Sequence, residues 1–249
     1  MSRKLDEKTP PADKLPGIDA PLTFQGFSPE TYRFFIELSL NNNKVFFDEN
    51  RARYIEHVQT PMRALAADLM PHMLRVDPGF NTKMVSVVSR IYRDARRLFG
   101  SPPYRDHLWM SFKHPTGPDE PDHFGMYFEV SPGGYGYGLG IYQPSPAFMT
   151  AVRAGIIADP TRFLNLCHAA GMERYTLEGE SFKRDRFHDV PDEVKPYLNM
   201  RRMSWCYFCE DLAPTLNGET LFQEVCTELV KLGPLYRYIM EASATARDE

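Results

Sequence analysis

The side chains best suited to chemistry gather in one stretch, Arg90-Ile-Tyr-Arg-Asp-Ala-Arg-Arg97, which holds four arginines and one aspartate. Tyr104-Arg105-Asp106-His107 follows it closely. Guanidinium groups repel one another, so a chain crowds them beside an anionic ligand, an acidic side chain or open solvent. Arginine also forms forked hydrogen bonds with phosphate and carboxylate groups. The stretch therefore predicts a site that binds, or binds and processes, a small anionic molecule.

Eight residues are candidates for binding this ligand. They are Arg90, Arg93, Arg96, Tyr104, Arg105, His107, Lys183 and Arg184. A connection between adjacent antiparallel strands brings its two ends together, so we expect Arg90 and Arg93 to lie near Arg105 and His107. Tyr104 and His107 are expected to add hydrogen bonds, and His107 is also a candidate proton carrier.

Two interpretations of the arginines stay open. In the first they line a pocket, with Asp94 orienting one guanidinium group. In the second they form internal ion pairs of a non-catalytic structural or interaction module, bound to Asp94, Asp106 or the C-terminal ends of helices. The second basic run, Lys183-Arg-Asp-Arg186, is either a solvated turn or a segment that closes the site. Burial and pairing of the guanidinium groups separate the two interpretations.

Glycines alternate along the segment Gly134-Tyr-Gly-Tyr-Gly-Leu-Gly140. In a strand, this spacing leaves one face of a sheet without side chains. Glycine weakens a strand, so the spacing indicates either a ligand lying on the sheet or the close approach of packed neighbours, and we favour the second. No Gly-Lys-Ser/Thr sequence follows, so the segment is not a phosphate-binding loop.

Other catalytic patterns are weak. Cys206 and Cys209 have the spacing of a redox dithiol or half a zinc site, but no helix start and no further ligands accompany them, so we expect structural cysteines. The seven histidines lack the spacing of metal ligands. No Gly-x-Ser-x-Gly sequence supplies a serine nucleophile. We therefore predict no metal site, and the sequence identifies no cofactor.

Helices are expected in the N-terminal part of the chain. Residues 1–22 are rich in proline and charge, which predicts a flexible tail. Ser28-Pro29 is a typical helix start, and Asn41-Asn-Asn43 ends that helix. Further helices are expected over residues 44–58 and from Thr60-Pro61 to about residue 77.

Alternation of apolar residues then predicts strands. The four segments are residues 85–92, 107–113, 123–130 and 134–141, with Ser131-Pro-Gly133 turning the last hairpin. The elements expected after them are helices from Ser145 and Asp159, a short strand over 175–177, irregular and helical pieces over 191–211, and a helix over 220–244 that bends near Gly233. This order predicts a single α+β domain over residues 23–249, with a central antiparallel sheet (a meander) packed by N- and C-terminal helices.

Length and composition limit the class of protein. The chain has 249 residues, of which 43% are hydrophobic and 25% charged, as in ordinary globular proteins. A formal net charge of −4 argues against a nucleic-acid-binding protein, which needs a basic surface. We expect no membrane span and no secretory signal, because no apolar run is long enough for either. Four cysteines do not form a disulfide framework, which favours the cytoplasm.

Several motifs occur in the order found in a known family. They are Phe24-x-Gly-Phe27, Phe34-Phe-x-x-Leu38, Asn41-Asn-Asn43, Phe47-Asp48, Pro61-Met62, Arg90-Ile-x-Arg-Asp-x-Arg96, Pro103-Tyr-Arg-x-His107, Ser131-Pro-Gly-Gly134, Gly138-x-Gly-x-Tyr-x-Pro-Ser-Pro146 and Leu177-x-Gly179 with Lys183-Arg184. On these residues, the chain resembles domain of unknown function family 2461, which is widespread and largely bacterial. The resemblance implies a single α+β domain with no established activity.

One segment departs from the family pattern. The family continues from the arginines as Phe-Ser-Lys-Asp-Lys, whereas this chain has Arg97-Leu-Phe-Gly-Ser101. Arg105 also stands in place of a lysine. If the missing serine, lysines and acid perform a reaction in the family, this chain lacks that reaction or binds a different molecule.

Overall fold

The computed structural model describes residues 20–94, 96, 100–115 and 122–244. The expected tail, residues 1–22, therefore lies almost wholly outside the described residues, and so does Arg97. Within the described chain, no helix combines the length and the apolar character needed to cross a membrane.

One five-stranded antiparallel sheet lies at the centre, with the strand order β1-β2-β3-β5-β4. The strands are β1 (Leu108–Lys113), β2 (Gly125–Ser131), β3 (Gly134–Gly140), β4 (Thr176–Glu178) and β5 (Ser204–Cys209). The α-helices are α1 (Pro29–Leu40), α2 (Lys44–Glu49), α3 (Arg51–Tyr54), α4 (Thr60–Val76), α5 (Met84–Val87), α6 (Pro146–Ala158), α7 (Pro160–Ala170), α8 (Lys195–Leu198), α9 (Gly218–Lys231) and α10 (Gly233–Ala244). The expected α+β class is confirmed.

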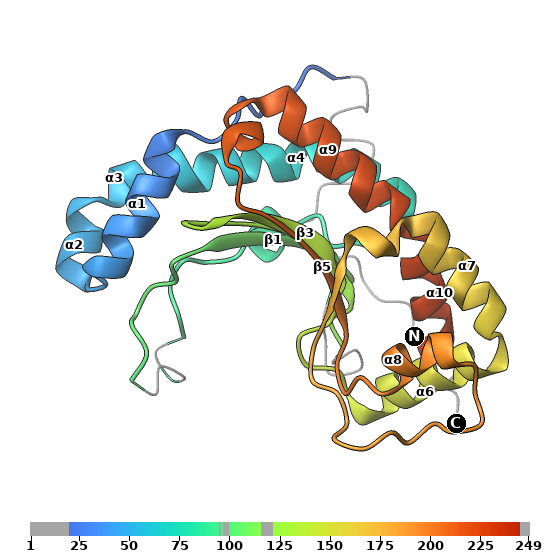
Figure 1. Ribbon diagram of the computed structural model, residues 1–249. Helices are drawn as coiled ribbons and strands as arrows, with labels where there is room; N and C mark the ends of the chain where they lie inside the picture. The colour runs from blue at the N-terminus through green and yellow to red at the C-terminus, as the bar shows by residue number, and fades with distance from the viewer. Residues whose placement is uncertain (1–19, 95, 97–99, 116–121, 245–249) are drawn as a thin grey trace, which may run out of the picture.

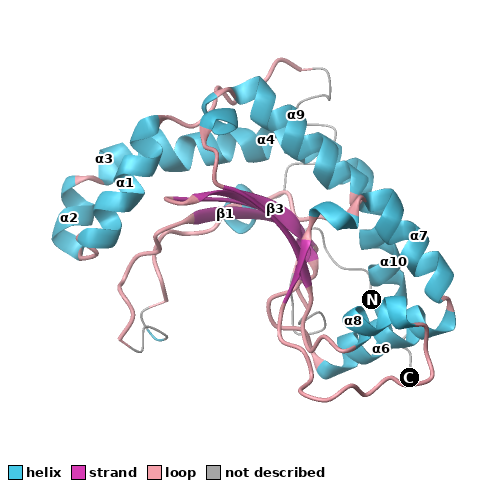
Figure 2. Cartoon of the chain, in the orientation of Figure 1, coloured by secondary structure: helices cyan, strands magenta, loops and turns pink. Residues whose placement is uncertain are grey.

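The sheet is curved, and the long helices α4 and α9 lie over its convex face (Figures 1 and 2). Strand alternation sends side chains such as Met110 and Phe128 into the core, where both are fully buried. On β3, the hydroxyls of Tyr135 and Tyr137 each donate to the Glu224 carboxylate of α9 at 2.9 Å. On β1 and β2 the alternate side chains lie on the concave face, whereas the alternate residues of β3 are glycines.

The expected helix starts at the N-terminal end are confirmed, with one difference. Pro29 opens α1 directly behind Ser28. The single helix expected over residues 44–58 is instead divided at Asn50 into α2 and α3, which continues through a π-helical turn into α4. Pro61 follows that turn and has no N–H to donate to it, so the wider turn accommodates the proline.

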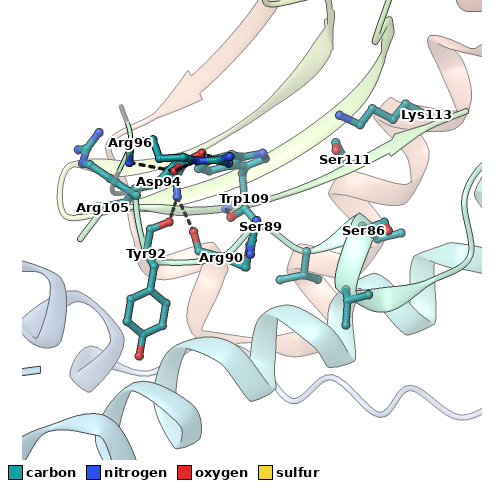
Figure 3. A pocket seen from close by; sticks show the side chains of 14 residues that line it. Ser86, Ser89, Arg90, Tyr92, Asp94, Arg96, Arg105, Trp109, Ser111 and Lys113 are labelled. Atoms are coloured by element: carbon teal, nitrogen blue, oxygen red, sulfur yellow. Dashed lines mark hydrogen bonds and ion pairs between the residues drawn. The ribbon is translucent and has the colours of Figure 1, made fainter. Parts of the chain in front are cut away.

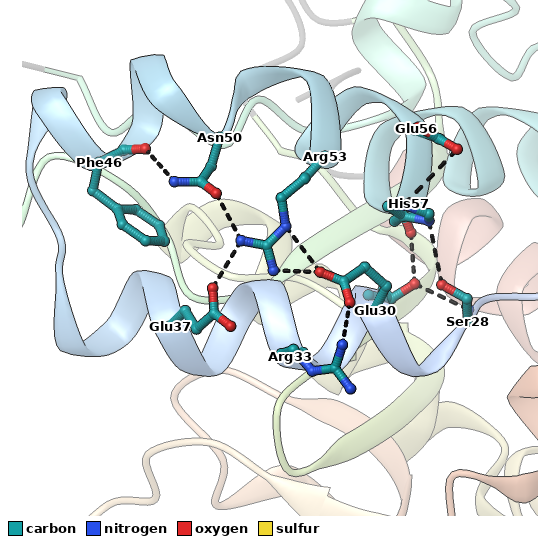
Figure 4. A network of polar contacts seen from close by, with 10 residues as sticks. Ser28, Glu30, Arg33, Glu37, Phe46, Asn50, Arg53, Glu56 and His57 are labelled. Carbon is teal, nitrogen blue, oxygen red and sulfur yellow. Dashed lines mark hydrogen bonds and ion pairs between the residues drawn. The ribbon is translucent and has the colours of Figure 1, made fainter.

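An ion-pair network fixes α3 against α1 (Figure 4). Arg53 donates from Nε to Glu30 and from Nη1 to Glu37, both at 2.8 Å. Glu30 also pairs with Arg33 at 2.6 Å, and the hydrogen bond from Arg53 lowers the pKa of Glu30. The network joins α3 to α1, and the intervening helix α2 carries Phe47, which stacks on Tyr104.

The expectation of a strand over residues 85–92 is wrong, because these residues form a helical turn followed by isolated bridges at Val88 and Tyr92. Met84–Val87 form the helical turn α5, because two successive amides donate back to the Lys83 carbonyl, at 2.8 and 3.0 Å. The chain then touches β1 at an isolated bridge between Val88 and Met110. A local turn has therefore replaced strand pairing where the apolar alternation begins.

The expectation of irregular and helical pieces over residues 191–211 is wrong for Ser204–Cys209, which form β5 between β3 and β4. Strand alternation places Cys206 and Cys209 on opposite faces of the sheet. All four cysteines are free, and burial raises the pKa of the Cys206 thiol to about 12. The pair therefore lacks the geometry of a redox dithiol, and Cys206 lacks the lowered thiol pKa of a reactive cysteine.

In the C-terminal half, the helix starts expected at Ser145-Pro146 and Asp159-Pro160 are confirmed. Helix α6 begins behind Ser145 and α7 behind Asp159, and both cap side chains accept a backbone N–H of the first turn. The last expected helix is two helices, since α9 ends at Lys231 and α10 begins at Gly233. The short strand expected at 175–177 is β4, shifted by one residue.

Neighbouring strands explain the glycines of β3. A Cβ at Gly136 would lie 2.8 Å from the Tyr207 carbonyl oxygen, and a Cβ at Gly138 would overlap the Trp205 carbonyl oxygen. The Tyr127 ring of β2 also leans over Gly138, 3.1 Å from such a Cβ. The close approach of packed neighbours therefore accounts for the glycine spacing.

Replacing Gly138 with alanine is expected to destabilise the protein by about 2 kcal/mol or more, because backbone would have to move to admit the methyl group. Gly133→Ala, in the preceding hairpin turn, is the matched control, since its Cβ would have no neighbour closer than 4.0 Å. We expect the control to change stability by less than about 0.5 kcal/mol. Urea unfolding measures both, and equal effects of the two substitutions would contradict this account of the glycines.

A carboxylate joins three elements at the end of α4. Asp77 accepts hydrogen bonds from the Gly79 amide at 2.7 Å and the Tyr236 hydroxyl of α10 at 2.8 Å, and it lies 2.7 Å from Nε2 of His114, just beyond β1. Burial raises the pKa of Asp77, but these three partners outweigh burial and the pKa is lowered. The ionised carboxylate thus stabilises the fold.

Asp77→Asn is expected to lower the free energy of unfolding by about 1–3 kcal/mol near neutral pH. Because the folded-state pKa is lowered, the stabilisation is fully present above about pH 4, the value for an unfolded aspartate, and is lost as pH falls through the folded value. Urea unfolding at decreasing pH should therefore show the variant and wild type converging. A difference that stays constant down to about pH 3 would contradict this role.

Candidate functional site

A pocket of about 400 Å³ opens between residues 85–96 and strand β1 (Figure 3). Strand β1 contributes three of the side chains that line this pocket, those of Trp109, Ser111 and Lys113. These residues alternate with fully buried neighbours on the same strand, so they lie on the concave face of the sheet. The remaining lining residues are Val85, Ser86, Val87, Val88, Ser89, Arg90, Tyr92, Arg93, Asp94, Arg96 and Arg105.

Backbone hydrogen bonds bring the two ends of the arginine-rich segment together. The Arg93 amide donates to the Pro103 carbonyl at 2.9 Å, and the Arg105 amide donates to the Ile91 carbonyl at 2.8 Å. The chain thus forms a short two-stranded ribbon beyond the edge of the sheet. This ribbon produces the proximity of Arg93 and Arg105 that the sequence predicts.

Arg105 is a strut of the pocket. Its Nη1 donates to the Arg90 carbonyl at 2.7 Å and also to the Tyr92 carbonyl. Its guanidinium carbon lies 5.0 Å from the centre of the Trp109 ring. Burial, followed by the positive charges of Arg93 and Arg90, lowers the pKa of Arg105. Carbonyl oxygens hold this guanidinium in place but do not neutralise its charge.

The other arginines differ in their partners. Arg96 donates to both carboxylate oxygens of Asp94, at 3.0 and 2.8 Å, as the ion-pair interpretation expects. Arg93 donates from Nε to the Tyr104 carbonyl at 3.2 Å. Within the described residues, the exposed Arg90 side chain has no hydrogen bond or ion pair. Asp94 is the one described carboxylate in the pocket wall, which carries five cationic side chains.

Lys113 forms the far end of the pocket, beside Ser111 (Figure 3). Burial lowers the pKa of its ammonium group. In the part of the chain that the structure describes, this group has no ion pair. Lys113 lies outside the arginine motif, although the alternation of residues 107–113 places it on the same strand face as Trp109.

Tyr104 and His107 lie beside the pocket and not in its wall. Tyr104 is buried, and its ring stacks on Phe47 with 4.3 Å between ring centres. His107 stacks on Trp109 at 5.4 Å, and its Nδ1 lies 2.9 Å from Asp106 Oδ1. His107 is therefore one contact away from the pocket, whereas the packing of Tyr104 belongs to the helices.

The second basic run is not part of this pocket. Lys183 and Arg184 are exposed in the loop after β4. This loop lies on the opposite side of the concave face from the ribbon at residues 90–94 and 100–107 (Figure 1). In that loop, the guanidinium of Arg186 stacks on Phe182 at 3.9 Å. The structure thus brings together Arg90, Arg93, Arg96 and Arg105, and it does not bring Lys183 or Arg184 to them.

The pocket wall combines guanidinium, ammonium, hydroxyl and indole groups. Charge-assisted hydrogen bonds from such cations bind phosphate and carboxylate groups, and each contributes about 1.5–3 kcal/mol. Among the described residues, no group of three or more His, Cys, Asp or Glu side chains is placed to hold a metal ion. The arrangement can therefore hold an anion by direct contact with the chain.

Comparison with known proteins places the chain in a family. The model of the conserved hypothetical protein family DUF2461 matches residues 30–238, which include the pocket and the whole sheet. No curated protein matches the chain. The chain therefore belongs to the DUF2461 family of conserved hypothetical proteins.

Proposed function

We propose that this protein binds a small anionic molecule, through a phosphate or carboxylate group, in the pocket between residues 85–96 and β1. The supporting observation is charge: five cationic side chains line the pocket, and its one described carboxylate, Asp94, is already bound by Arg96. Positive groups held this close repel one another, and an entering anion relieves the repulsion. The proposal is one of binding and assigns no reaction.

A structural role for the arginines is the competing proposal. Arg96 and Arg105 support it, because a carboxylate holds the first and two backbone carbonyls hold the second. Arg90 supports ligand binding, because its side chain has no partner among the described residues and lines an open pocket. The two roles can be separated by comparing binding with stability.

The double substitution of Arg90 and Arg93 by alanine is expected to weaken the binding of inorganic phosphate or pyrophosphate at least about tenfold. Each substitution removes a guanidinium group that would form a charge-assisted hydrogen bond with the anion. Thermal shift and isothermal titration calorimetry at low ionic strength measure the loss. Arg184→Ala is the matched control, because it removes an equally exposed arginine outside the pocket. Binding that is unchanged in the double variant would remove the proposal.

Arg105→Gln is expected to lower stability as well as binding, because it removes the bonds to two carbonyl oxygens. The expected cost is about 1–3 kcal/mol in the free energy of unfolding. Arg90→Ala should leave the stability of the free protein within about 0.5 kcal/mol of wild type. Urea unfolding without added anions checks both values. A variant at Arg105 as stable as wild type would show that this residue is not a strut.

We also propose that the protein works in the cytoplasm without a nucleic-acid or membrane partner. The four free cysteines support a reducing compartment. The formal net charge of −4 disfavours binding to nucleic acid. A gel shift that weakens with added salt would count against this part of the proposal.

A further inference from the structure

The pocket carries positive charge at both of its ends. Arg90 and Arg105 lie at one end (Figure 3). Arg93 lines the same pocket, and its charge contributes to lowering the pKa of the partly buried Arg105. Lys113, the last residue of β1, stands at the other end. Asp94 and its partner Arg96 lie on the arginine side, so the acid does not compensate Lys113.

Strand geometry sets the separation of the two ends. The Arg105 guanidinium lies 5.0 Å from the Trp109 ring, near the start of β1. An antiparallel strand rises about 3.4 Å per residue, so the stretch from Trp109 to Lys113 spans about 14 Å. One phosphate group is much smaller than this distance and cannot contact both ends at once.

Among the described residues, no carboxylate forms an ion pair with the partly buried ammonium group of Lys113. Burial lowers the pKa of this ammonium group. Burial lowers the pKa of the neighbouring His123, and the positive charge of Lys113 lowers it further, although Asp122 opposes the shift. The Asp122 carboxylate accepts hydrogen bonds from the amide and hydroxyl of Ser145. A desolvated and unpaired charge costs free energy, which a bound anion would recover.

The wall between the two ends is uncharged. Trp109 presents an aromatic ring, Ser111 and Ser89 present hydroxyls, and Val85 presents an exposed apolar side chain. Such a wall suits a carbon chain or a polyhydroxylated skeleton rather than a third anionic group. The distribution of groups is therefore cationic, neutral and cationic along β1.

We propose that the ligand is an elongated molecule with an anionic group at each end, one held by Arg90, Arg93 and Arg105 and the other by Lys113. This inference rests on the proposed anion binding and narrows its ligand to bis-anionic molecules with an uncharged middle. It also assigns Lys113 a binding role that the arginine motif does not include.

Calorimetric titration with alkane bisphosphonates of increasing chain length tests the inference. Each bisphosphonate, from methylene to decamethylene, is compared with the alkyl monophosphonate of equal chain length, which controls for contacts of the chain itself. The longest bisphosphonates should bind wild type about tenfold more tightly than their monophosphonates, because a second charge-assisted hydrogen bond forms. Lys113→Met, which keeps the apolar stem, should remove this advantage, so that long bisphosphonates and their monophosphonates bind the variant equally well. Lys44→Met, at an exposed helix start, is the control.

Two failures are distinguishable. If phosphate binds but the long bisphosphonates show no advantage, or keep it in Lys113→Met, the bis-anionic ligand is excluded while the proposed anion site stands. If wild type binds neither phosphate nor any phosphonate, the proposed site itself falls and this inference falls with it.

Discussion

Repulsion between guanidinium groups, opposed by backbone hydrogen bonds, is the constraint on which the candidate site depends. The amides of Arg93 and Arg105 bond across the ribbon to Pro103 and Ile91, and this pairing fixes the arginines beside one another. The backbone has no freedom to separate the charges without breaking these bonds. The lowered pKa of Arg105 is the electrostatic consequence, because burial and two like charges disfavour its protonated form.

The rest of the fold supports that ribbon from one side and leaves the other side open. Tyr104 stacks on Phe47, and the Asn42 side chain bonds both the amide and the carbonyl of Tyr104, at 3.0 Å each. Helix α2 and the turn before it therefore hold the back of the ribbon. The core beneath α4 and α9 takes one set of strand side chains, so the alternate set on β1 is free to form the pocket floor. A single alternating strand thus serves the core and the candidate site together.

Much of this architecture could be predicted from the sequence, because its signals are local. Proline and cap residues marked the starts of α1, α6 and α7, and strict alternation marked β1 to β3. The convergence of Arg93 and Arg105 followed from antiparallel connectivity alone. Strand β5 could not be predicted, because aromatic residues occupy both of its faces and it lacks the alternating pattern of a half-buried strand. Helix α5 could not be predicted either, because its hydrogen bonds to the Lys83 carbonyl compete locally with strand pairing.

The candidate site was harder to predict than the fold for a different reason. Residue type and spacing identify a cluster of charges, but the direction of each side chain depends on packing that the sequence does not state. The sequence indicates Tyr104 as a hydrogen-bond donor to the ligand, but in the structure its ring is buried against Phe47, which is distant in the sequence. The arginine motif does not include Lys113. Strand geometry nevertheless places this residue in the wall of the same pocket. Contacts between segments that are distant in the sequence therefore determine the surroundings of both side chains.

A crystal structure of the protein grown with inorganic pyrophosphate would test the central claim most directly. The account predicts pyrophosphate in the pocket on the concave side of β1, with its oxygens within hydrogen-bonding distance of the Arg90 and Arg93 guanidinium groups. An empty pocket in which these two side chains pair with carboxylates of the same chain would contradict the account.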